Sequence, residues 1–361
     1  MDPRLPVGTS VLGVRVVLAD PPAYTPFYDH DLATALAALG ADVELLTSPF
    51  RFGELPPATG YSRRESFYPL STRLFRRSRL RIPVKALEHP LVLARLAAVR
   101  ADVVHVQWLT APQVDARLLR LRAPAVFTAH DLLPRRTAAK RDLWLRLLAR
   151  FDAVVVHSDN GRRTLAELGV PDERLRVIPL AITPVQAPHG DDGRTLLVFG
   201  VLRPYKGLPD ALEVTRRIED TRLIVAGDPA MQLDGLDGDR IDWRLGYLPE
   251  PEVRRALSDA TVALFPYRPE LDQSAALATV LGAGIPAVVY DVNGVAEPVR
   301  RFAAGRVVPA GDVDGLEAAA RELLDDRDAL AAARAGAERA RDELTWTASA
   351  RAHLELYREL A

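Results

Sequence analysis

Short runs of apolar residues alternate along the chain with longer segments of helical period. In the first half these runs occupy residues 14–18, 42–47, 103–106, 125–128 and 153–156. The runs are continuous and rich in β-branched residues, which is typical of strands buried on both faces in a parallel sheet. A first helix is expected over residues 31–39, where Gly40 ends it.

The same pattern restarts after residues 179–193, which are rich in Pro, Gly and Asp and lack periodicity. We interpret this segment as an interdomain linker. Beyond it, strands are expected at 196–199, 223–226, 262–265 and 287–290, and helices at 208–218, 251–258, 273–283, 314–324 and 346–360.

The pattern therefore predicts an α/β protein with two Rossmann-like, doubly wound parallel-sheet domains, over residues 1–180 and 181–345. The final helix, within residues 346–361, is expected to cross back to the first domain. Two such domains facing each other place a ligand in the cleft between them, at the carboxyl ends of the strands.

The segment FGVLRPYKG, residues 199–207, lies between an expected strand and an expected helix. Gly200 and Gly207 let the backbone approach a ligand closely, and Arg203 and Lys206 supply positive charge, which together suit a phosphate ester. The chain has only three lysines among its 47 basic residues. A lysine kept in so arginine-rich a chain indicates a specific role, although an ordinary surface lysine is the alternative.

Composition describes a globular protein of more than one domain. The 361 residues are 48% hydrophobic and 26% charged, and cysteine is absent, so neither a disulfide nor a thiolate metal site is expected. Residues 11–19 are short and carry Arg15, unlike a secretory signal, and no apolar run is long enough to span a bilayer. A cytoplasmic location, with association to the inner face of the membrane as a further option, is expected.

The net charge of −1 conceals an asymmetry between the two halves. Residues 1–180 carry 26 basic and 18 acidic side chains, whereas residues 181–361 carry 21 and 30. Residues 61–85 hold eight of the basic side chains, interleaved with aromatic and aliphatic residues, against Glu65 alone. This combination suits contact with an anionic membrane, and a solvated loop is the alternative. No nucleic-acid partner is expected, because no recognised binding motif accompanies the patch.

Several motifs are absent or have a simpler explanation. No G-x-G-x-x-G follows the first strand and no G-x-x-x-x-G-K-[ST] occurs, which disfavours a dinucleotide oxidoreductase and a P-loop enzyme. Asp312 and Asp314 have the spacing of a metal-binding pair. Their setting, followed by Glu317 and an apolar run, favours a helix N-cap instead.

The ordered set of motifs resembles a known family. FGVLRPYKG, LIVAGD (223–228), GYLPEPEVRRALSDATVALFPY and GAGIPAVVYDVNGVAEPV are similar to the C-terminal domain of GT-B glycosyltransferases of family four. ADVVHVQW, VFTAHDLLP and FDAVVVHSDNGRRTL extend the resemblance to the first half, so it covers nearly the whole chain.

The resemblance implies a nucleotide-diphospho-sugar donor whose diphosphate binds an Arg and a Lys in this loop. Lys206 matches the lysine, whereas the family's arginine position holds Val201, so Arg203 is the expected substitute. Fixed cations and helix N-terminal amides stabilise the charge that develops on the leaving diphosphate. With these groups no metal is required, and no cofactor beyond the donor is expected.

A second motif departs further from the family. The usual E-x7-E pair falls here on Leu271 and Thr279. Glu270 and Asp272 flank the first position, as donor ligands or as solvated loop charges, and Thr279 can still offer one hydrogen bond to a ribose hydroxyl. Gln273 and Ser274 resemble a branch of the family with Gln-Ser-Gly at a helix start, where Ser274 either faces phosphate or only caps the helix.

The remaining site residues follow expected strands. The resemblance implies that His130 contacts the donor sugar or its reaction centre, and that the base packs near Gly246 and Tyr247. A structural histidine is the alternative for His130, and His105 and His157 are expected to be buried and satisfied. Tyr28, Asp29 and His30 follow the first strand and are expected to bind acceptor hydroxyls, and a role for Asp29 as a base is the alternative.

These observations predict a glycosyltransferase that moves a sugar from a nucleotide-diphospho-sugar to an acceptor hydroxyl. The resemblance implies retention of configuration and front-face displacement without a protein nucleophile. A nucleotide-sugar 2-epimerase of the same fold and a degenerate, non-catalytic binding protein remain alternatives. The acceptor is expected to be a glycan, a glycolipid or a small molecule.

Overall fold

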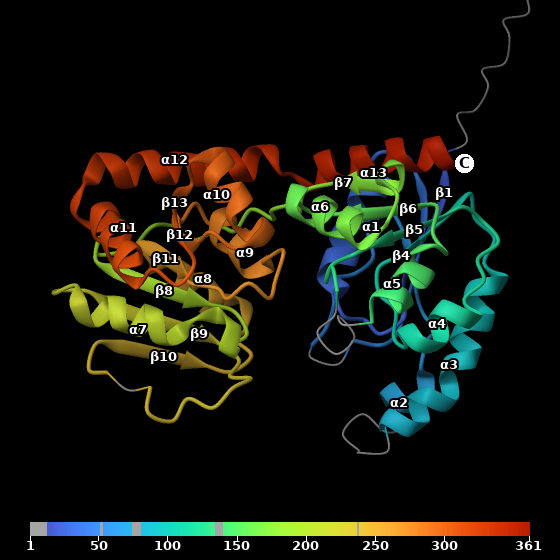
Figure 1. The fold of residues 1–361 in the computed structure, drawn as a ribbon, viewed down its shortest axis with the longest axis horizontal. Coiled ribbons are helices and arrows are strands. Elements are labelled where there is room, and N and C mark those ends of the chain that lie inside the picture. The colour runs from blue at the N-terminus through green and yellow to red at the C-terminus, as the bar shows by residue number, and fades with distance from the viewer. Residues whose placement is uncertain (1–12, 51–52, 74–80, 134–139, 237) are drawn as a thin grey trace, which may run out of the picture. The chain divides into compact units, whose positions relative to one another are not determined.

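A computed structural model describes residues 13–50, 53–73, 81–133, 140–236 and 238–361. The chain forms two compact units, each of which is described by itself. The first consists of Met1–Ala129, Ala139–Val155 and Ala350–Ala361, and the second of His130–Ala138 and Val156–Ser349. Figure 1 shows a parallel sheet with helices around it in each unit.

The first sheet has seven strands in the order β3-β2-β1-β4-β5-β6-β7, and its last strand, β7 (Leu175–Val177), falls in the second unit. The elements of the first unit are β1 (Arg15–Asp20), α1 (Pro26–Ala38), β2 (Asp42–Thr47), β3 (Ser62–Glu65), α2 (Pro69–Arg73), α3 (Arg81–Ala98), β4 (Val103–Val106), α4 (Pro112–Leu118), β5 (Ala125–Thr128), α5 (Arg141–Leu148) and β6 (Ala153–Val156). β1 pairs in parallel with both β2 and β4. All residues of β4, β5 and β6 are buried, as expected for central strands covered on both faces.

Helix α1 begins earlier than its hydrophobic pattern suggests. It starts at Pro26 and not at Asp31, because proline is well suited to the first helical turn, where its missing N–H has no partner to lose. The expected start at residue 31 is therefore wrong. Tyr28, Asp29 and His30 lie within the helix.

The second unit contains a six-stranded sheet with the order β10-β9-β8-β11-β12-β13. Its elements are α6 (Asp159–Leu168), η1 (Asp172–Arg174), β7 (Leu175–Val177), β8 (Thr195–Phe199), η2 (Pro204–Lys206), α7 (Leu208–Arg217), β9 (Arg222–Gly227), β10 (Ile241–Leu245), α8 (Glu250–Ser258), β11 (Val262–Phe265), α9 (Ala275–Gly282), β12 (Ala287–Tyr290), η3 (Asn293–Ala296), α10 (Glu297–Phe302), β13 (Gly305–Val308), α11 (Val313–Asp325), α12 (Arg327–Glu343) and α13 (Trp346–Leu360), which continues into the first unit. The strand pairs of this sheet are parallel. The predicted fold class, two doubly wound parallel-sheet domains, is confirmed.

Two hydrophobic clusters cover the two faces of this sheet. Leu197, Ile224 and Ala263 belong to one cluster, and their strand neighbours Leu196, Leu223 and Val262 belong to the other. Successive residues of a strand point to opposite faces, so both faces of the sheet are buried. At roughly 25 cal/mol per Å² of apolar surface, this two-sided burial is the main stabilising contribution.

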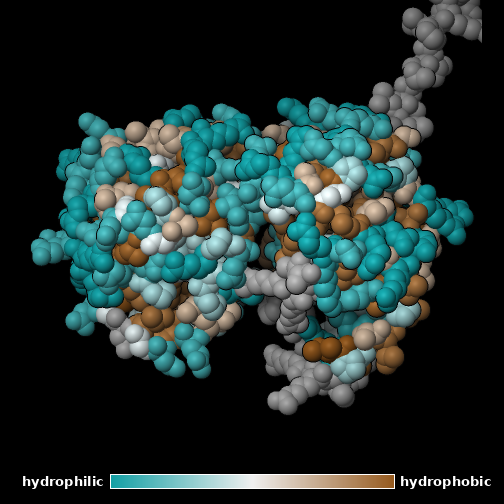
Figure 2. Space-filling model, viewed as in Figure 1, coloured by the Kyte–Doolittle hydropathy of each residue, from teal (hydrophilic) through white to brown (hydrophobic). Residues whose placement is uncertain are grey.

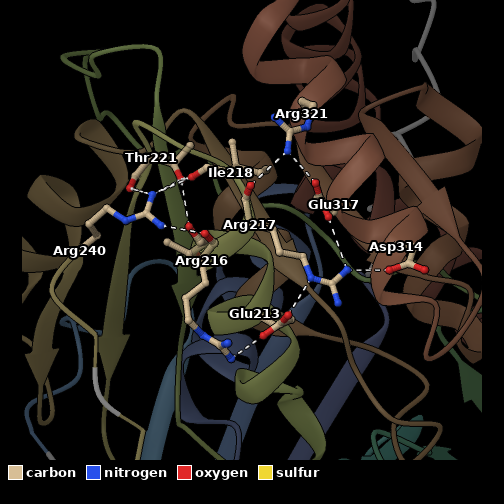
Figure 3. Close-up of polar contacts among 10 residues, drawn as sticks. Glu213, Arg216, Arg217, Ile218, Thr221, Arg240, Asp314, Glu317 and Arg321 are labelled. Carbon is tan, nitrogen blue, oxygen red and sulfur yellow. Dashed lines mark hydrogen bonds and ion pairs between the residues drawn. The ribbon is translucent and has the colours of Figure 1, made fainter.

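An ion-pair network ties α7 to α11 on the surface of the second unit (Figure 3). The Arg217 guanidinium bonds to Glu213 on its own helix and to Asp314 on α11, at 2.7 and 2.6 Å. Asp312 caps α11, because its carboxylate accepts the N–H of Gly315 at 2.9 Å. The N-cap interpretation of Asp312 is confirmed, and Asp314 serves the network rather than a metal pair.

The C-terminal part of α13 packs into the first unit through a buried polar chain. The Tyr357 hydroxyl lies 2.6 Å from His105 Nδ1, and His105 Nε2 lies 2.7 Å from the Thr128 hydroxyl. Each ring nitrogen of His105 thus has a partner, as expected for a histidine within a buried strand.

Candidate functional site

The second sheet reverses its winding direction between β8 and β11. From β8 the strand order runs outward through β9 and β10 on one side and through β11, β12 and β13 on the other. In open parallel sheets the ligand site lies outside the carboxyl ends of the strands at such a switch point. The residues that follow β8 and β11 here are Gly200 and the pair Pro266 and Tyr267.

The side chain of Lys206 links the end of β8 to the residues that follow β11. This residue ends η2, only 4% of its surface is exposed, and its Nζ atom donates to the Phe199 carbonyl and the Tyr267 hydroxyl, both at 2.7 Å. Among the described residues no carboxylate forms an ion pair with it. Burial, and then the nearby charge of Arg203, lower the pKa of Lys206 to about 7. A buried cation without a counter-ion is costly, and an arriving anion would remove that cost.

The two glycines of the loop are required by its geometry. Gly200 has φ +90°, and a Cβ there would lie 3.1 Å from Lys206 Nζ and 3.0 Å from Ala276 Cβ. Gly207 has φ +65°, and a Cβ would lie 2.0 Å from the Pro266 carbonyl oxygen. Gly200 thus leaves space beside the ammonium, and Gly207 lets the loop pack onto the end of β11.

Ser274 extends the polar chain that begins at Lys206. Its hydroxyl lies 3.2 Å from the Tyr267 hydroxyl and accepts the N–H of Leu277 at 3.1 Å, so Ser274 is the N-cap of α9. The N-terminus of this helix carries partial positive charge. Lys206, Tyr267 and the first turn of α9 therefore form one contiguous group that is suited to an anion.

Arg203 is exposed and precedes η2 as its N-cap residue. Its charge is near enough to lower the pKa of Lys206, so the two cations share one region. The predicted pairing of Arg203 with Lys206 is consistent with this proximity.

Asp272 is neither a solvated charge nor an open acceptor. Its carboxylate is 8% exposed, and it accepts from the Ser158 hydroxyl at 2.5 Å, from the Asn160 amide at 2.9 Å and from the Gly294 N–H at 3.1 Å. Those bonds tie the start of α6 to η3. Asp272 therefore holds these two segments of the chain together.

The other predicted donor residues of this region differ in their environments. Glu270 is exposed in the loop before α9. Gln273 is half-buried, and its amide reaches the Gly294 carbonyl at 3.5 Å. The Thr279 hydroxyl donates to the Ala275 carbonyl at 2.9 Å, one turn back along α9. Ribose recognition by Thr279 would require this bond to be exchanged.

Gly246 and Tyr247 follow β10 at the edge of the sheet. Gly246 has φ +120°, its N–H bonds to the Gly227 carbonyl at 3.0 Å, and a Cβ added there would meet no atom within 4 Å. Tyr247 is 61% exposed. An open backbone beside an exposed aromatic ring is compatible with the predicted contact to a base.

His130 lies next to a second histidine. The His130 Nδ1 atom is 3.4 Å from His157 Nε2, and His157 Nδ1 is 2.8 Å from the Ile178 carbonyl. Burial lowers the pKa of His157, so its ring is neutral with the proton on Nδ1. His157 Nε2 is then available to accept an N–H from His130 Nδ1.

The expected acceptor residues lie in the first unit and are largely buried. Asp29 is fully buried, and His30 Nδ1 lies 2.8 Å from the Tyr61 hydroxyl. Burial, and then the neighbouring carboxylate of Asp20, raise the pKa of Asp29 well above its usual range, whereas the pKa of Asp20 rises to about 6. Burial also raises the pKa of Tyr28. The Asp20 carboxylate accepts the N–H of Thr25, the residue before α1, at 3.1 Å. Acceptor binding by Tyr28, Asp29 and His30 stays a prediction.

A cavity of about 330 Å³ adjoins Ser274 within the second unit. It is lined by α9, α10 and the segment that follows β7, and its walls are mainly apolar. Its polar lining side chains include Gln273, His157 and Glu297. The cavity thus extends the site along one side of α9.

Tyr267 is a candidate site residue that the sequence pattern does not reveal. Its hydroxyl joins Lys206 to Ser274, and burial raises its pKa. The only signal was an aromatic residue directly after an apolar strand, which is more often part of a core.

Two family models match consecutive parts of the chain. "Glycosyltransferase Family 4" matches residues 28–186, and "Glycosyl transferases group 1" matches residues 193–326. The chain belongs to the family four, group 1 glycosyltransferases. The resemblance noted from the motifs is confirmed.

Curated relatives of this glycosyltransferase are named for different activities. A GDP-mannose:glycolipid 4-beta-D-mannosyltransferase of Xanthomonas campestris pv. campestris is 28% identical over 216 residues, covering 47% of this chain and 56% of the relative. A glycogen synthase of Mycobacterium tuberculosis is 26% identical and covers 91% of this chain and 89% of the relative. The chain spans little more than half the length of the first of these curated relatives.

Solved structures share the fold at low identity. A sucrose-phosphate synthase from Thermosynechococcus elongatus has a TM-score of 0.73 at 21% identity, covering 96% of this chain and 99% of the other. HepE from Anabaena, solved with UDP and glucose, has a TM-score of 0.70 at 14% identity, covering 96% and 100%. These similarities establish the GT-B fold.

Proposed function

We propose that this chain transfers a sugar from a nucleotide-diphospho-sugar to an acceptor hydroxyl, with retention of configuration and without a metal. The observation that carries the proposal is the ammonium of Lys206, which is buried at the switch point without a carboxylate partner among the described residues. A diphosphate supplies the missing negative charge, and supplies more of it as the glycosidic bond breaks.

In this proposal different residues of the site bind the diphosphate, the sugar and the base of the donor. Lys206 and Arg203 bind the diphosphate, and the first turn of α9, capped by Ser274, offers N–H groups to the same oxygens. His130, oriented by His157, contacts the donor sugar through Nε2. Gly246 and Tyr247 receive the base. The leaving phosphate oxygen accepts the acceptor's proton, so the transfer needs no protein nucleophile.

The partners that we propose are a nucleotide-sugar and a glycan, glycolipid or small-molecule acceptor. The mannosyltransferase relative is named for a glycolipid and HepE was solved with UDP-glucose, which supports these classes without choosing among them. We further propose a cytoplasmic protein that associates with an anionic membrane.

The departure from E-x7-E supports one alternative, a binding protein without turnover. The first motif position is Leu271 and the second, Thr279, is bonded within its own helix. Release of free nucleoside diphosphate decides between the two functions. We expect turnover by the unaltered chain and none by Lys206→Met, with Lys140→Met, a substitution at an exposed lysine, as the matched control.

A thermal-shift screen against UDP, GDP, ADP and dTDP identifies the base. A ligand that binds only the folded state raises the melting temperature. Stabilisation by one of the four, lost in Lys206→Met, is the result expected. Binding that survives in Lys206→Met would contradict the proposed diphosphate site, and tight binding without turnover would favour the non-catalytic alternative.

A further inference from the structure

Helix α3 buries Val92, Leu93 and Leu96 but also turns an apolar face to solvent. Its buried side chains include Glu88 and His89. Its exposed side chains include Ile82, Leu87 and Leu91, which are 74%, 81% and 61% exposed. A surface helix normally turns its apolar face to the core and its charges to water, so the outward face of α3 requires another explanation.

The orientation of α3 is fixed by its buried polar groups. The Glu88 carboxylate accepts the backbone N–H groups of Leu70 and Ser71, at 2.8 and 2.9 Å. The His89 ring lies between the Tyr68 hydroxyl and the Asp115 carboxylate, at 2.7 Å from each. Rotating the helix to bury Leu87 and Leu91 would break all four contacts and leave charged groups unpaired. The exposed apolar face is therefore a fixed feature of the fold.

The exposed apolar residues form a continuous stripe. They recur at intervals of four along α3, as Ile82, Ala86, Pro90 and Ala94 and, beside them, Pro83, Leu87 and Leu91. Residues at this spacing lie one above another on a helix. At 1.5 Å per residue the 18-residue helix is about 27 Å long. Leu70 on α2 and Leu118 on α4, 50% and 58% exposed, add to the apolar surface of the neighbouring helices.

The exposed charges of α2, α3 and α4 all have one sign. The acidic residues of α2, α3 and α4 are Glu88 and Asp115, and both are buried. Arg73, Arg95 and Arg117 on the same three helices are exposed. Figure 2 shows hydrophobic side chains gathered over α2 and α3 at the lower right. The arginines at 76, 77 and 79, part of the basic stretch seen in the sequence, lie outside the described residues.

We infer that the outward face of α3, with Leu70 and the exposed arginines of α2 to α4, docks on a lipid bilayer that contains anionic headgroups. Aliphatic side chains on one face of a helix, bordered by cations, suit the boundary between acyl chains and headgroups. No helix within the described residues is long and apolar enough to cross a bilayer.

A second copy of the chain fits this face less well. A two-fold contact places the same patch on both sides of the interface, so the exposed arginines would face one another. The stripe also offers few hydrogen-bonding side chains, whereas specific protein interfaces carry many. A bilayer needs neither charge alternation nor paired hydrogen bonds.

Vesicle co-sedimentation of the full chain tests this inference. The probes are vesicles of phosphatidylcholine alone and of phosphatidylcholine with an equal amount of phosphatidylglycerol. We expect binding to the anionic vesicles only. Leu87→Glu/Leu91→Glu should weaken it about tenfold or more, and Arg73→Gln/Arg95→Gln should weaken it about fivefold for each arginine removed. Added salt should weaken binding of the unaltered chain.

The matched control is Ala331→Glu/Ala332→Glu, which makes the same change in net charge at exposed positions of α12. It should bind vesicles as the unaltered chain does. Circular dichroism and the melting temperature of each variant establish that it folds, and Leu87→Ala/Leu91→Ala gives a second, milder test. Equal binding by the leucine variants and the control would overturn the inference. A change from dimer to monomer in the leucine variants, without any vesicle binding, would overturn it in favour of self-association.

The inference rests on the proposed function and names the surface that meets the membrane. Membrane docking and sugar transfer can nevertheless be tested independently. Vesicle binding needs no donor and no turnover, so Lys206→Met should bind vesicles normally. The leucine variants should still release nucleoside diphosphate with a water-soluble acceptor. Loss of turnover with vesicle binding intact would contradict only the transfer proposal.

Discussion

The Nζ atom of Lys206 lies 2.7 Å from the hydroxyl of Tyr267, and that hydroxyl lies 3.2 Å from Ser274 at the start of α9. The tyrosine thus fixes the ammonium between the ends of β8 and β11 without neutralising it. A carboxylate in the same place would bind the lysine more strongly but would repel a diphosphate. Tyr267 is therefore placed to position the ammonium in the proposed anion site.

Tyr267→Phe should lower the pKa of Lys206, because the ammonium loses one hydrogen-bond acceptor while the aromatic ring stays. A hydrogen bond to a charged group contributes about 1.5–3 kcal/mol, which corresponds to roughly one or two pKa units. Affinity for a nucleoside diphosphate should then begin to fall at a lower pH than in the unaltered chain. Calorimetric titrations from pH 5.5 to pH 8.5 measure this shift.

Tyr205→Phe is the control for that titration. Its ring packs edge-on against Tyr267, but its hydroxyl is not among the partners of Lys206. It should leave the pH dependence unchanged. An unchanged profile in Tyr267→Phe as well would show that the tyrosine hydroxyl does not act through the lysine.

Lys206→Met should stabilise the fold near neutral pH. The folded pKa of Lys206 is about 7, below its ordinary value of 10.5, so the unfolded chain holds the extra proton between these limits. Stability therefore rises with pH across this window, and the cost of the buried ammonium is fully present below pH 7. Urea unfolding should show a gain on the order of 3 kcal/mol at pH 6 that shrinks by pH 9.5. A loss of stability at pH 6 would mean that the lysine supports the fold.

Gly200→Ala should weaken diphosphate binding and destabilise the fold. The added methyl group would lie against Lys206 Nζ, and φ +90° is unfavourable for alanine. Gly40→Ala is the matched control, since Gly40 has φ +91° and no atom within 4 Å of the Cβ position. Both variants should lose about 1–2 kcal/mol of stability from backbone strain. Only Gly200→Ala should lose affinity in the calorimeter, and equal affinity in both would refute the close approach.

Asp272→Ala should destabilise the fold, whereas Glu270→Gln should not. Asp272→Ala leaves the hydroxyl of Ser158, the amide of Asn160 and the N–H of Gly294 without an acceptor, so we expect about 3 kcal/mol of destabilisation. Glu270 is exposed, and its substitution should leave the melting temperature unchanged. If Glu270 binds the donor, KM for the nucleotide-sugar rises. A melting temperature unaffected by Asp272→Ala would contradict its positioning role.

Asp29→Asn should stabilise the first unit at high pH. The folded pKa of Asp29 is raised by burial and by Asp20, so the folded chain holds a proton that the unfolded chain releases. Stability is thus lost as pH rises above about 4, and asparagine avoids this loss. Chemical unfolding should show a gain of about 1–3 kcal/mol at pH 8 and little at pH 4. Asp142→Asn, at an exposed position of α5, should show no such dependence.

The central strands were predictable because they are buried on both faces and so read as continuous apolar runs. Strands such as β3 and β10 were harder to recognise, because an edge strand keeps polar residues: β3 is SRRE and β10 is IDWRL. The start of α1 was missed because Tyr28, Asp29 and His30 lack the apolar period of a helix, although Pro26 marks its first turn.

The site was predictable only where its residues lie close together in the sequence. The glycines and cations of one loop indicated an anion site. Tyr267 escaped notice because its partner is 61 residues away, and the sheet order alone brings them together. Asp272 resembled a loop charge because its three donors come from α6 and η3, distant segments that only the fold assembles.

Nuclear magnetic resonance of the lysine side chains tests the anion site most directly. The chain has only Lys85, Lys140 and Lys206, so three Nζ signals can be assigned with Lys→Arg variants. We predict that Lys206 titrates near pH 7 in the free protein, and that the nucleoside diphosphate found in the thermal screen raises its pKa while Lys85 and Lys140 do not respond. A Lys206 signal that titrates near pH 10.5 and is unmoved by every diphosphate would contradict the account.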